Sequence, residues 1–340
     1  MLTASVIVSL LGLVISQGPP SSSASHGLEL YKEINYPWDR LEGPRSIKGG
    51  EACPVTQYTW DFYFKYLIEN GVRSFLLGGY AMVQSMILPR YYPPWDKAGL
   101  KALKEQVEAK GGKILADLGM YKDRTFDKRA FLESVTKFIK DYPVDGFRLG
   151  LSPAYSDRGQ SLREVLEAIK EQNLHCSLWF SGTAWQIVKD HRLGTIADTY
   201  FFLLLPVKDE DKPVFNTDNF AEEAIKEITL AGVRPNQLAL TIPVAAAISS
   251  LDTKIGYSRA IFDFKGDPTG EGSFMLTPST TLYFFSQTRA IDKIELARKH
   301  GLHGIALQAS DNERADLHPW DPRSLLYALA MNIIGSPQTF

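Results

Sequence analysis

The stretch Lys113–Pro153, KILADLGMYKDRTFDKRAFLESVTKFIKDYPVDGFRLGLSP, decides the fold. Short apolar runs lie near its two ends, at Lys113–Leu118 and Asp145–Leu151, and each has the length of a buried strand bounded by turn residues. Between them, Lys128–Lys140 carries apolar residues at helical spacing among charged ones, which predicts an amphipathic helix. A strand, a helix and a second strand in this order favour a parallel β-α-β unit.

The same alternation continues on both sides of this unit. Six further apolar or β-branched runs have the character of strands, at Leu28–Ile34, Ser74–Gly79, His175–Phe180, Thr199–Leu205, Gln237–Pro243 and His303–Gln308. Helical patterns accompany them, at Trp60–Glu69, Lys97–Ala109, Leu162–Glu171, Trp185–Lys189, Ala221–Ala231, Ile291–Lys299 and Pro322–Ile334. Eight strand–helix pairs predict one α/β domain folded as a (β/α)8 TIM barrel. A doubly wound open sheet shows the same alternation, but the sequence lacks the glycine-rich phosphate turn that usually accompanies it.

The chain divides into three predicted segments. An apolar run at Val6–Ile15 has the length of a signal-peptide core and is too short to span a bilayer, so residues 1–16 are interpreted as a signal peptide of a secreted protein. An ordinary strand or helix is the alternative for this run. Residues 17–26 are interpreted as a polar linker and residues 27–340 as the barrel. The polar, Gly/Pro-rich residues 249–281 are interpreted as a short insertion after strand seven.

Composition argues against several classes of partner. Of the 340 residues 44% are hydrophobic and 22% are charged, with a formal net charge of −2, which is an ordinary globular balance that gives no field for nucleic acid or for an anionic membrane. The six histidines are scattered without the spacing of a metal site, and we expect no metal and no cofactor. Cys53 and Cys176 are too few for a disulfide scaffold and are interpreted as unpaired thiols, with a single bridge as the alternative.

The stretch at Lys113–Pro153 resembles the third and fourth strands of glycoside hydrolase family 18, the chitinase family. That family has a helix of the form F-x-x-S-V-x-x-F-x-x-x-Y followed by a strand of the form D-G-x-D-x-D-x-E. The matching residues here are Phe131, Ser134, Val135, Phe138, Tyr142, Asp145 and Gly146. Ile291–Ser310 and Pro322–Leu329 resemble the last strand and helices of the family. The resemblance extends over most of the chain after residue 25 and implies a chitinase-like (β/α)8 barrel.

The family's catalytic acids are replaced in this sequence. In the family, the last Glu of the fourth strand protonates the glycosidic oxygen, and the Asp two residues earlier orients the acetamide group of the substrate, which is the nucleophile. Residues two apart in a strand share a face, so the three inward acids would fall at 148, 150 and 152. The residues found there are Arg148, Gly150 and Ser152, and only the leading acid remains, as Asp145. Loss of a general acid alone typically costs about two to four powers of ten in rate.

Other substrate contacts of the family are also missing. Gln308 stands where the resemblance implies a Trp beneath the sugar, Leu203–Pro206 stands in place of an M-x-Y-D pattern, and Asp117 replaces a Ser. These losses together predict a non-catalytic chitinase-like protein, a pseudoenzyme with no catalytic residues. The alternative is an active glycoside hydrolase with relocated carboxylates drawn from Asp117, Asp145, Asp311 and Glu313.

Arg148 needs a partner if the alignment places it inside the barrel, because an unpaired buried charge is very costly. The adjacent third strand offers Asp117, which predicts a structural, bidentate Arg148–Asp117 pair across strands three and four. This pairing would keep Asp117 ionised and make it a poor acid. A shift of the alignment by one residue, which would leave Arg148 exposed, is the alternative.

A ligand site is predicted at the C-terminal face of the barrel, where barrel sites form. Trp38 follows strand one and Trp179 ends strand five, so both lie on that side, and aromatic faces stack on sugars. The candidate binding residues are Asp117, Arg148, Gln308, Trp179 and Trp38. The expected partner is a glycan or a protein ligand, and the alternative for the aromatic residues is packing over the barrel mouth.

Overall fold

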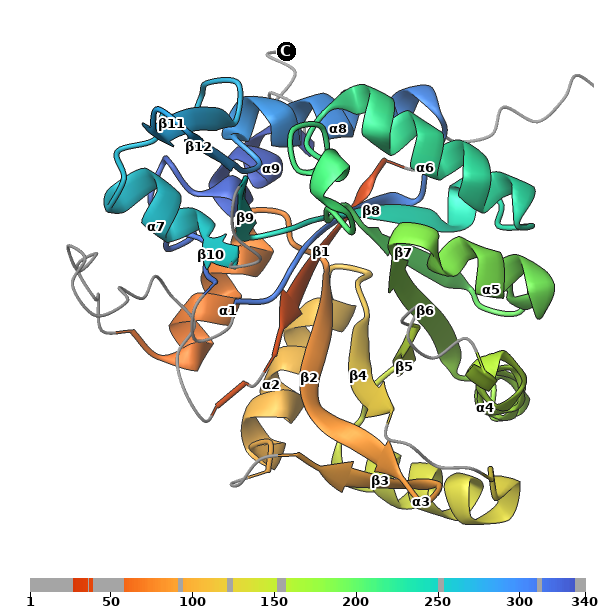
Figure 1. Ribbon diagram of the computed structural model, residues 1–340. Helices are drawn as coiled ribbons and strands as arrows, with labels where there is room; N and C mark the ends of the chain where they lie inside the picture. Colours follow the sequence, from red (N-terminus) through yellow and green to blue (C-terminus); the bar gives the residue numbers. More distant parts are fainter. Residues whose placement is uncertain are drawn as a thin grey trace, which may run out of the picture.

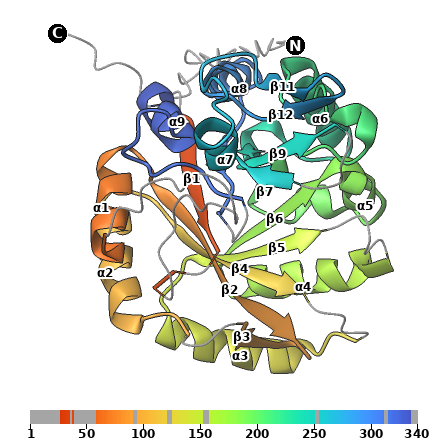
Figure 2. The same cartoon turned by 60° about the vertical axis from the view of Figure 1, so that its left-hand side comes forward.

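The protein forms a closed barrel of eight parallel strands, as Figures 1 and 2 show. The structure is a computed structural model and describes residues 27–35, 37–38, 58–90, 94–120, 125–151, 157–249, 254–310 and 314–333. In order around the barrel the strands are β1 (Glu29–Ile34), β2 (Ser74–Val83), β4 (Ile114–Met120), β5 (Gly146–Leu151), β6 (His175–Ser181), β7 (Thr199–Leu203), β8 (Leu238–Ile242) and β13 (Gly304–Leu307). Strand β1 pairs with both β2 and β13 and thereby closes the sheet. The predicted (β/α)8 fold is confirmed.

Helices surround the barrel (Figure 2). They are α1 (Trp60–Glu69), α2 (Lys97–Glu108), α3 (Lys128–Asp141), α4 (Gly159–Glu171), α5 (Trp185–Asp190), α6 (Asp218–Leu230), α8 (Gln287–Lys299) and α9 (Leu325–Ile333). Short 3-10 helices lie at Gly182–Ala184, Leu193–Thr195, Asp209–Asp211 and Pro235–Gln237. Side chains fix where several helices begin: Thr59, Asp96 and Asp127 each accept a hydrogen bond from a backbone N–H of the first turn.

Two additions decorate the barrel. Strand β3 (Met86–Pro89) forms an antiparallel hairpin with β2. After β8, the chain forms β9 (Ala245–Ile248), β10 (Lys254–Gly256), α7 (Tyr257–Phe262), β11 (Ser273–Thr277) and β12 (Thr280–Tyr283), whose strands make a small antiparallel sheet in the order β10-β9-β12-β11. Figures 1 and 2 place this sheet and β3 on opposite sides of the barrel. The segment interpreted as an insertion after strand seven therefore contains regular structure.

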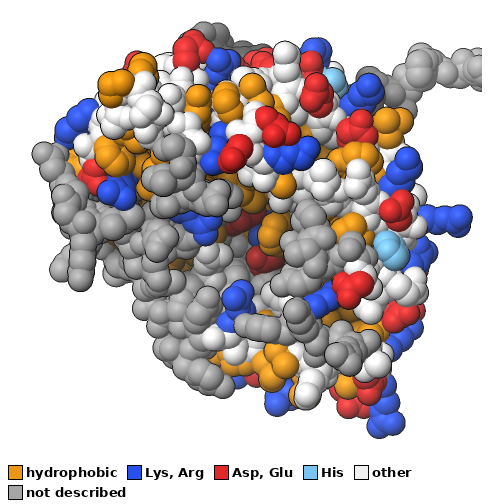
Figure 3. Space-filling view, in the orientation of Figure 1, with side chains coloured by type: hydrophobic (Ala, Val, Ile, Leu, Met, Phe, Trp, Pro, Cys, Tyr) orange, Lys and Arg blue, Asp and Glu red, His pale blue; other side chains and the backbone are white. Residues whose placement is uncertain are grey.

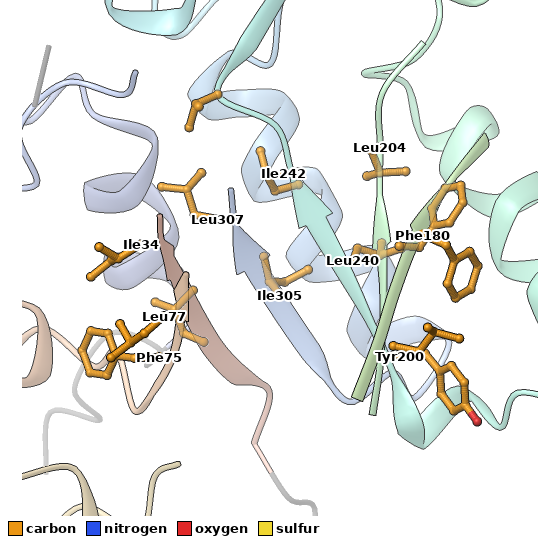
Figure 4. Packing of buried hydrophobic residues seen from close by; sticks show 14 of the residues in the cluster. Ile34, Phe75, Leu77, Phe180, Tyr200, Leu204, Leu240, Ile242, Ile305 and Leu307 are labelled. Carbon is orange, nitrogen blue, oxygen red and sulfur yellow. The ribbon is translucent and has the colours of Figure 1, made fainter. Parts of the chain in front are cut away.

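Alternation along the strands builds two apolar layers. Side chains that face outward pack against the helices, as Figure 4 shows for Phe75, Phe180 and Leu240. Side chains that face inward fill the barrel, and the inner cluster consists of Tyr31, Leu76, Leu115, Phe201, Ala239 and Ala306, with Trp179 packed on it. Because these side chains fill the interior, the barrel is a packed core and not a pore. Full burial of such a side chain contributes roughly 1.5–3 kcal/mol to the stability of the fold.

Several expectations fall outside the described residues: the signal peptide at 1–16, the linker at 17–26 and Cys53. Cys176 is a buried free thiol on β6. In the part of the chain that the structure describes, no helix has the length and apolar character needed to cross a membrane. The same residues contain no group of three or more His, Cys, Asp or Glu side chains placed to hold a metal ion.

Candidate functional site

The candidate site lies at the C-terminal ends of the barrel strands. A cleft of about 390 Å³ opens there, and the residues that line it include Asn35, Arg90, Asp117, Gly150 and Trp179. The face seen in Figure 3 is hollowed near its centre, and acidic and hydrophobic side chains are visible inside the hollow. Its volume falls in the range of roughly 300–1,000 Å³ that is usual for small-ligand pockets.

Arg148 lies beneath this cleft, inside the barrel. Strands β4 and β5 place Asp117 and Arg148 directly opposite each other, and the Nε of Arg148 donates to Oδ1 of Asp117 at 3.0 Å. The Nη1 of Arg148 donates to Oε1 of Glu33, which comes from β1 on the far side of β2 and β4. The Arg148 side chain is 3% exposed, Glu33 12% and Asp117 21%. The three residues form an ion-pair triad, in which Arg148 is buried and the two acids are partly buried.

The triad corrects one detail of the sequence prediction. Arg148 does point into the barrel and does bind Asp117, but it does not bind Asp117 through two parallel hydrogen bonds. Its guanidinium is shared between two carboxylates, because Glu33 reaches across the interior from β1. The sequence contained a weak indication that Glu33 faces the barrel interior, because Glu33 lies on the opposite face of β1 from the apolar residues Leu30 and Ile34. Only closure of the barrel brings Glu33 to Arg148.

Electrostatics and aromatic rings both stabilise the guanidinium. Burial acts to lower the pKa of Arg148, but the nearby charges of Asp117 and Glu33 outweigh burial and raise the pKa above its usual value. The guanidinium carbon also lies 5.5 Å from the ring centre of Phe201 and 5.9 Å from that of Trp179. Glu33 is further fixed because its Oε2 accepts from the backbone N–H of Ala309 at 3.3 Å. Arg148 is therefore a permanent cation at this position.

Gly150 and Trp179 fit together at the cleft. Strand β6 places Trp179 opposite Gly150 on β5, and a Cβ added at Gly150 would lie 2.8 Å from Nε1 and Cε2 of the Trp179 ring. The indole therefore occupies the space above Gly150 that a side chain at position 150 would need. It is half-buried and presents part of its ring to the cleft.

Two other predicted binding residues lie elsewhere. Trp38 packs against α1, with its ring centre 5.6 Å from that of Phe64, and a Cβ at Gly99 of α2 would meet its Nε1 at 2.5 Å. Gln308 accepts from the backbone N–H of Val244 at 3.3 Å. Neither residue lines the cleft described above. Their role as ligand contacts stays a prediction, and in this structure the Trp38 ring packs on Phe64 while the Gln308 side chain bonds to the backbone.

The remaining acids of the alternative hypothesis are not gathered at the cleft. Asp145 lies at the opposite end of β5, where it accepts from Lys104 of α2 at 2.5 Å and from the backbone N–H of Ile114 at 2.7 Å. It therefore braces α2 and β4 against β5. Ser152, Asp311 and Glu313 lie outside the described residues. Among the described residues that line the cleft, Asp117 is the one carboxylate, and Arg148 binds it.

Chitinases are among the solved structures similar to this chain. A chitinase from Chromobacterium violaceum has a TM-score of 0.62 at 10% identity, with 91% of this chain and 99% of that chain covered. A chitinase from Rhizomucor miehei has a TM-score of 0.60 at 13% identity, with 89% and 99% covered. The GH18 chitinase ChiB of Flavobacterium johnsoniae has a TM-score of 0.56 at 11% identity, with 90% and 94% covered. No family model and no curated protein sequence matches the chain. The shared architecture over most of each chain shows that this protein has the (β/α)8 barrel fold of the family 18 chitinases.

Proposed function

We propose that this chain is a secreted, non-catalytic chitinase-like protein that binds a glycan at the mouth of its barrel. The observation that carries the proposal is the Arg148–Asp117–Glu33 triad, with the cation buried inside the barrel. In the strand where the resemblance requires a row of inward acids, Arg148 is a cation and Gly150 has no side chain. Asp117, the one carboxylate among the described residues that line the cleft, accepts a hydrogen bond from the guanidinium of Arg148.

The same cleft has the chemistry to hold a sugar. The Trp179 ring offers an apolar face for stacking, and Asp117 uses one carboxylate oxygen for Arg148 and exposes part of its surface to the cleft. Asn35 and Arg90 add polar groups to the lining. Aromatic stacking and hydrogen bonds can hold a sugar in the cleft, and neither needs a residue that protonates the glycosidic oxygen.

Binding and turnover are measured separately to test this proposal. Titration calorimetry with chitohexaose measures binding, and a chromogenic chito-oligosaccharide reports hydrolysis. We expect binding without product release, and we expect Trp179→Ala to weaken binding by at least about tenfold, because a ring stacked on a ligand typically contributes on the order of 1 kcal/mol or more. Trp185→Ala is the matched control, since Trp185 begins α5 and does not line the cleft.

Product release would overturn the proposal if Asp117→Asn abolished it, because Asp117 would then be a relocated catalytic carboxylate. Unchanged affinity in Trp179→Ala would exclude the cleft as the binding site. Secretion is tested by expressing the full chain in a eukaryotic host and sequencing the N-terminus of protein recovered from the medium. Cleavage near residue 16 is expected, and an intact N-terminus on cell-retained protein would contradict it.

A further inference from the structure

A second hollow lies on the flank of the barrel, between β3 and α3. Its volume is about 460 Å³, and all four residues of β3 (Met86–Pro89) line one wall. Helix α3 supplies the other wall, with Glu133, Lys137 and Asp141 on successive turns. Figures 1 and 2 both show β3 lying along α3, well away from the small sheet of β9 to β12. We call this hollow the β3–α3 groove.

The apolar surface of the groove is held rigidly. Tyr80, Phe138 and Tyr142 line it and pack on one another and on the buried Trp95, with the Tyr80 ring centre 4.9 Å from those of both Trp95 and Phe138. The wall formed by β3 is fixed because the backbone N–H of Ile87 donates to Oγ of Ser134 at 2.8 Å. Met86 and Leu88 nevertheless remain 41% and 40% exposed. An apolar occupant would remove these side chains from water without rearranging the floor.

Two cations of α3, Lys137 and Lys140, form no ion pair within the described part of the chain, and of these Lys137 lines the groove. Nε of Arg129 lies 2.9 Å from a Glu133 carboxylate oxygen, and Nζ of Lys97 lies 2.8 Å from an Asp141 carboxylate oxygen. Lys137 stands between the two acids on the helix and forms no ion pair within the described part of the chain. The groove therefore offers an anionic ligand one cation, Lys137, flanked by two acids that are each paired with another residue.

We infer that the β3–α3 groove binds a small amphipathic carboxylate, with its apolar tail against Met86 and Leu88 and its carboxylate on Lys137. The volume of the groove suits such a molecule. An extended peptide added to the edge of β3 is a poorer fit. The Ile87 N–H is already bonded and Pro89 has no N–H, so two of the four residues of β3 offer no free backbone donor.

Decanoate, used below its micelle concentration, is the probe that tests this inference. Titration calorimetry on the full chain is expected to detect binding, with an affinity at least about tenfold weaker for decanol, which has the same tail without the charge. Decyltrimethylammonium is expected to bind no better than decanol. The variant Lys137→Gln is expected to weaken decanoate binding by at least about tenfold and to leave decanol unchanged.

Matched variants separate the groove from other sites and from misfolding. Lys140→Gln removes a charge from the same helix outside the groove lining and is expected to leave the affinity within about twofold. Trp179→Ala, at the barrel mouth, is expected to leave decanoate binding unchanged, so the result is independent of the proposed glycan site. The inference is overturned if the wild-type chain does not bind decanoate, if Lys137→Gln binds it as tightly as wild type, or if Lys140→Gln or Trp179→Ala weakens it as much.

Discussion

Arg148 determines what its neighbours at the barrel mouth can do. It lies on the strand face where the family resemblance implies acids, and it binds both Asp117 and Glu33 in one partly buried network. Two carboxylates against one guanidinium leave this network with a surplus negative charge, so removal of the cation affects both acids at once. The adjacent Gly150 complements Arg148, because its missing side chain lets Trp179 lie over the strand.

Replacing Arg148 is expected to destabilise the protein strongly. Arg148→Met keeps a long apolar side chain but leaves the partly buried Asp117 and Glu33 without their partner, and we expect a loss of up to about 3–5 kcal/mol in the free energy of unfolding, the range for a broken buried pair. Denaturant unfolding followed by circular dichroism measures this loss. Adding Asp117→Asn and Glu33→Gln to Arg148→Met should recover part of it. The control Arg129→Met breaks an exposed ion pair on α3 and should change stability by less than about 1 kcal/mol. If Arg129→Met and Arg148→Met lost equal stability, the structural role assigned to the triad would be contradicted.

Gly150 is predicted to tolerate no side chain while Trp179 keeps its place. In Gly150→Ala, the Cβ would come within 2.8 Å of the indole, so the ring must move. Overpacking of this kind typically costs about 1–3 kcal/mol, and the displaced ring should alter the tryptophan fluorescence. The double variant Gly150→Ala/Trp179→Ala should be more stable than the sum of the single effects predicts. Strict additivity of the two changes would show that the residues do not compete for space.

At the scale of elements, the eight barrel strands and eight of the helices were predictable because each repeats a local pattern. Helix α1 was predicted at its observed bounds, Trp60–Glu69, and Gly71 beyond its end has a φ of 91°, as a left-handed position after a helix requires. Strands β11 and β12 were not predictable, because SFMLT and TTLY lie in a polar, Gly/Pro-rich segment and gain their structure from pairing with each other and with β9.

The candidate site was partly predictable, because two of its residues lie on strands that the local sequence pattern indicates. Arg148 and Asp117 lie opposite each other on neighbouring strands, so their pairing follows once the two strands are recognised. Glu33 is 115 positions from Arg148 in sequence and meets it only across the closed barrel. The direction of the Trp38 side chain could not be predicted, because a position after a strand does not determine which way the chain turns, and at Trp38 a φ of 67° accompanies a ring that packs on α1.

Helix α9 depends on an acid outside it. The carboxylate of Asp316 is buried and accepts from the backbone N–H groups of Leu325 and Leu326, from that of Leu317 and from the hydroxyl of Ser324. Asp316→Ala would leave these donors unsatisfied inside the protein, so we expect a loss of at least about 2 kcal/mol. Thermal unfolding measures this loss of stability. The comparison is Thr59→Ala, which removes the exposed cap of α1 and is expected to cost about 1 kcal/mol. A smaller loss for Asp316→Ala than for Thr59→Ala would contradict the role assigned to Asp316.

At the scale of the whole molecule, the two ends of the barrel have different chemistry. The C-terminal end carries the cleft and the triad. The N-terminal end carries a set of partly buried polar contacts: Tyr31 to His303 at 2.8 Å, His175 to Thr199 at 3.1 Å and Ser74 to Glu29 at 2.8 Å. Burial lowers the pKa of His175 to about 4 and also lowers that of His303, and in both cases the nearby charge of Lys113 acts in the same direction. Burial outweighs the nearby charge of Asp198, which acts to raise the pKa of His175, so the imidazole of His175 is favoured in its neutral form.

This preference makes the stability of the barrel depend on pH. The folded-state pKa of His175 lies below the unfolded value near 6.5, so between pH 6.5 and about 4 the unfolded chain binds more protons than the folded one. The free energy of unfolding should therefore be fully retained above pH 6.5 and should fall on acidification through this window, by on the order of 1–3 kcal/mol. Urea unfolding at a series of pH values measures the slope. His175→Gln removes the titrating group and leaves the carboxylates in place, so the difference in slope between wild type and variant isolates the contribution of His175. Equal slopes for wild type and His175→Gln would show that the imidazole of His175 is not held neutral by its burial in the barrel.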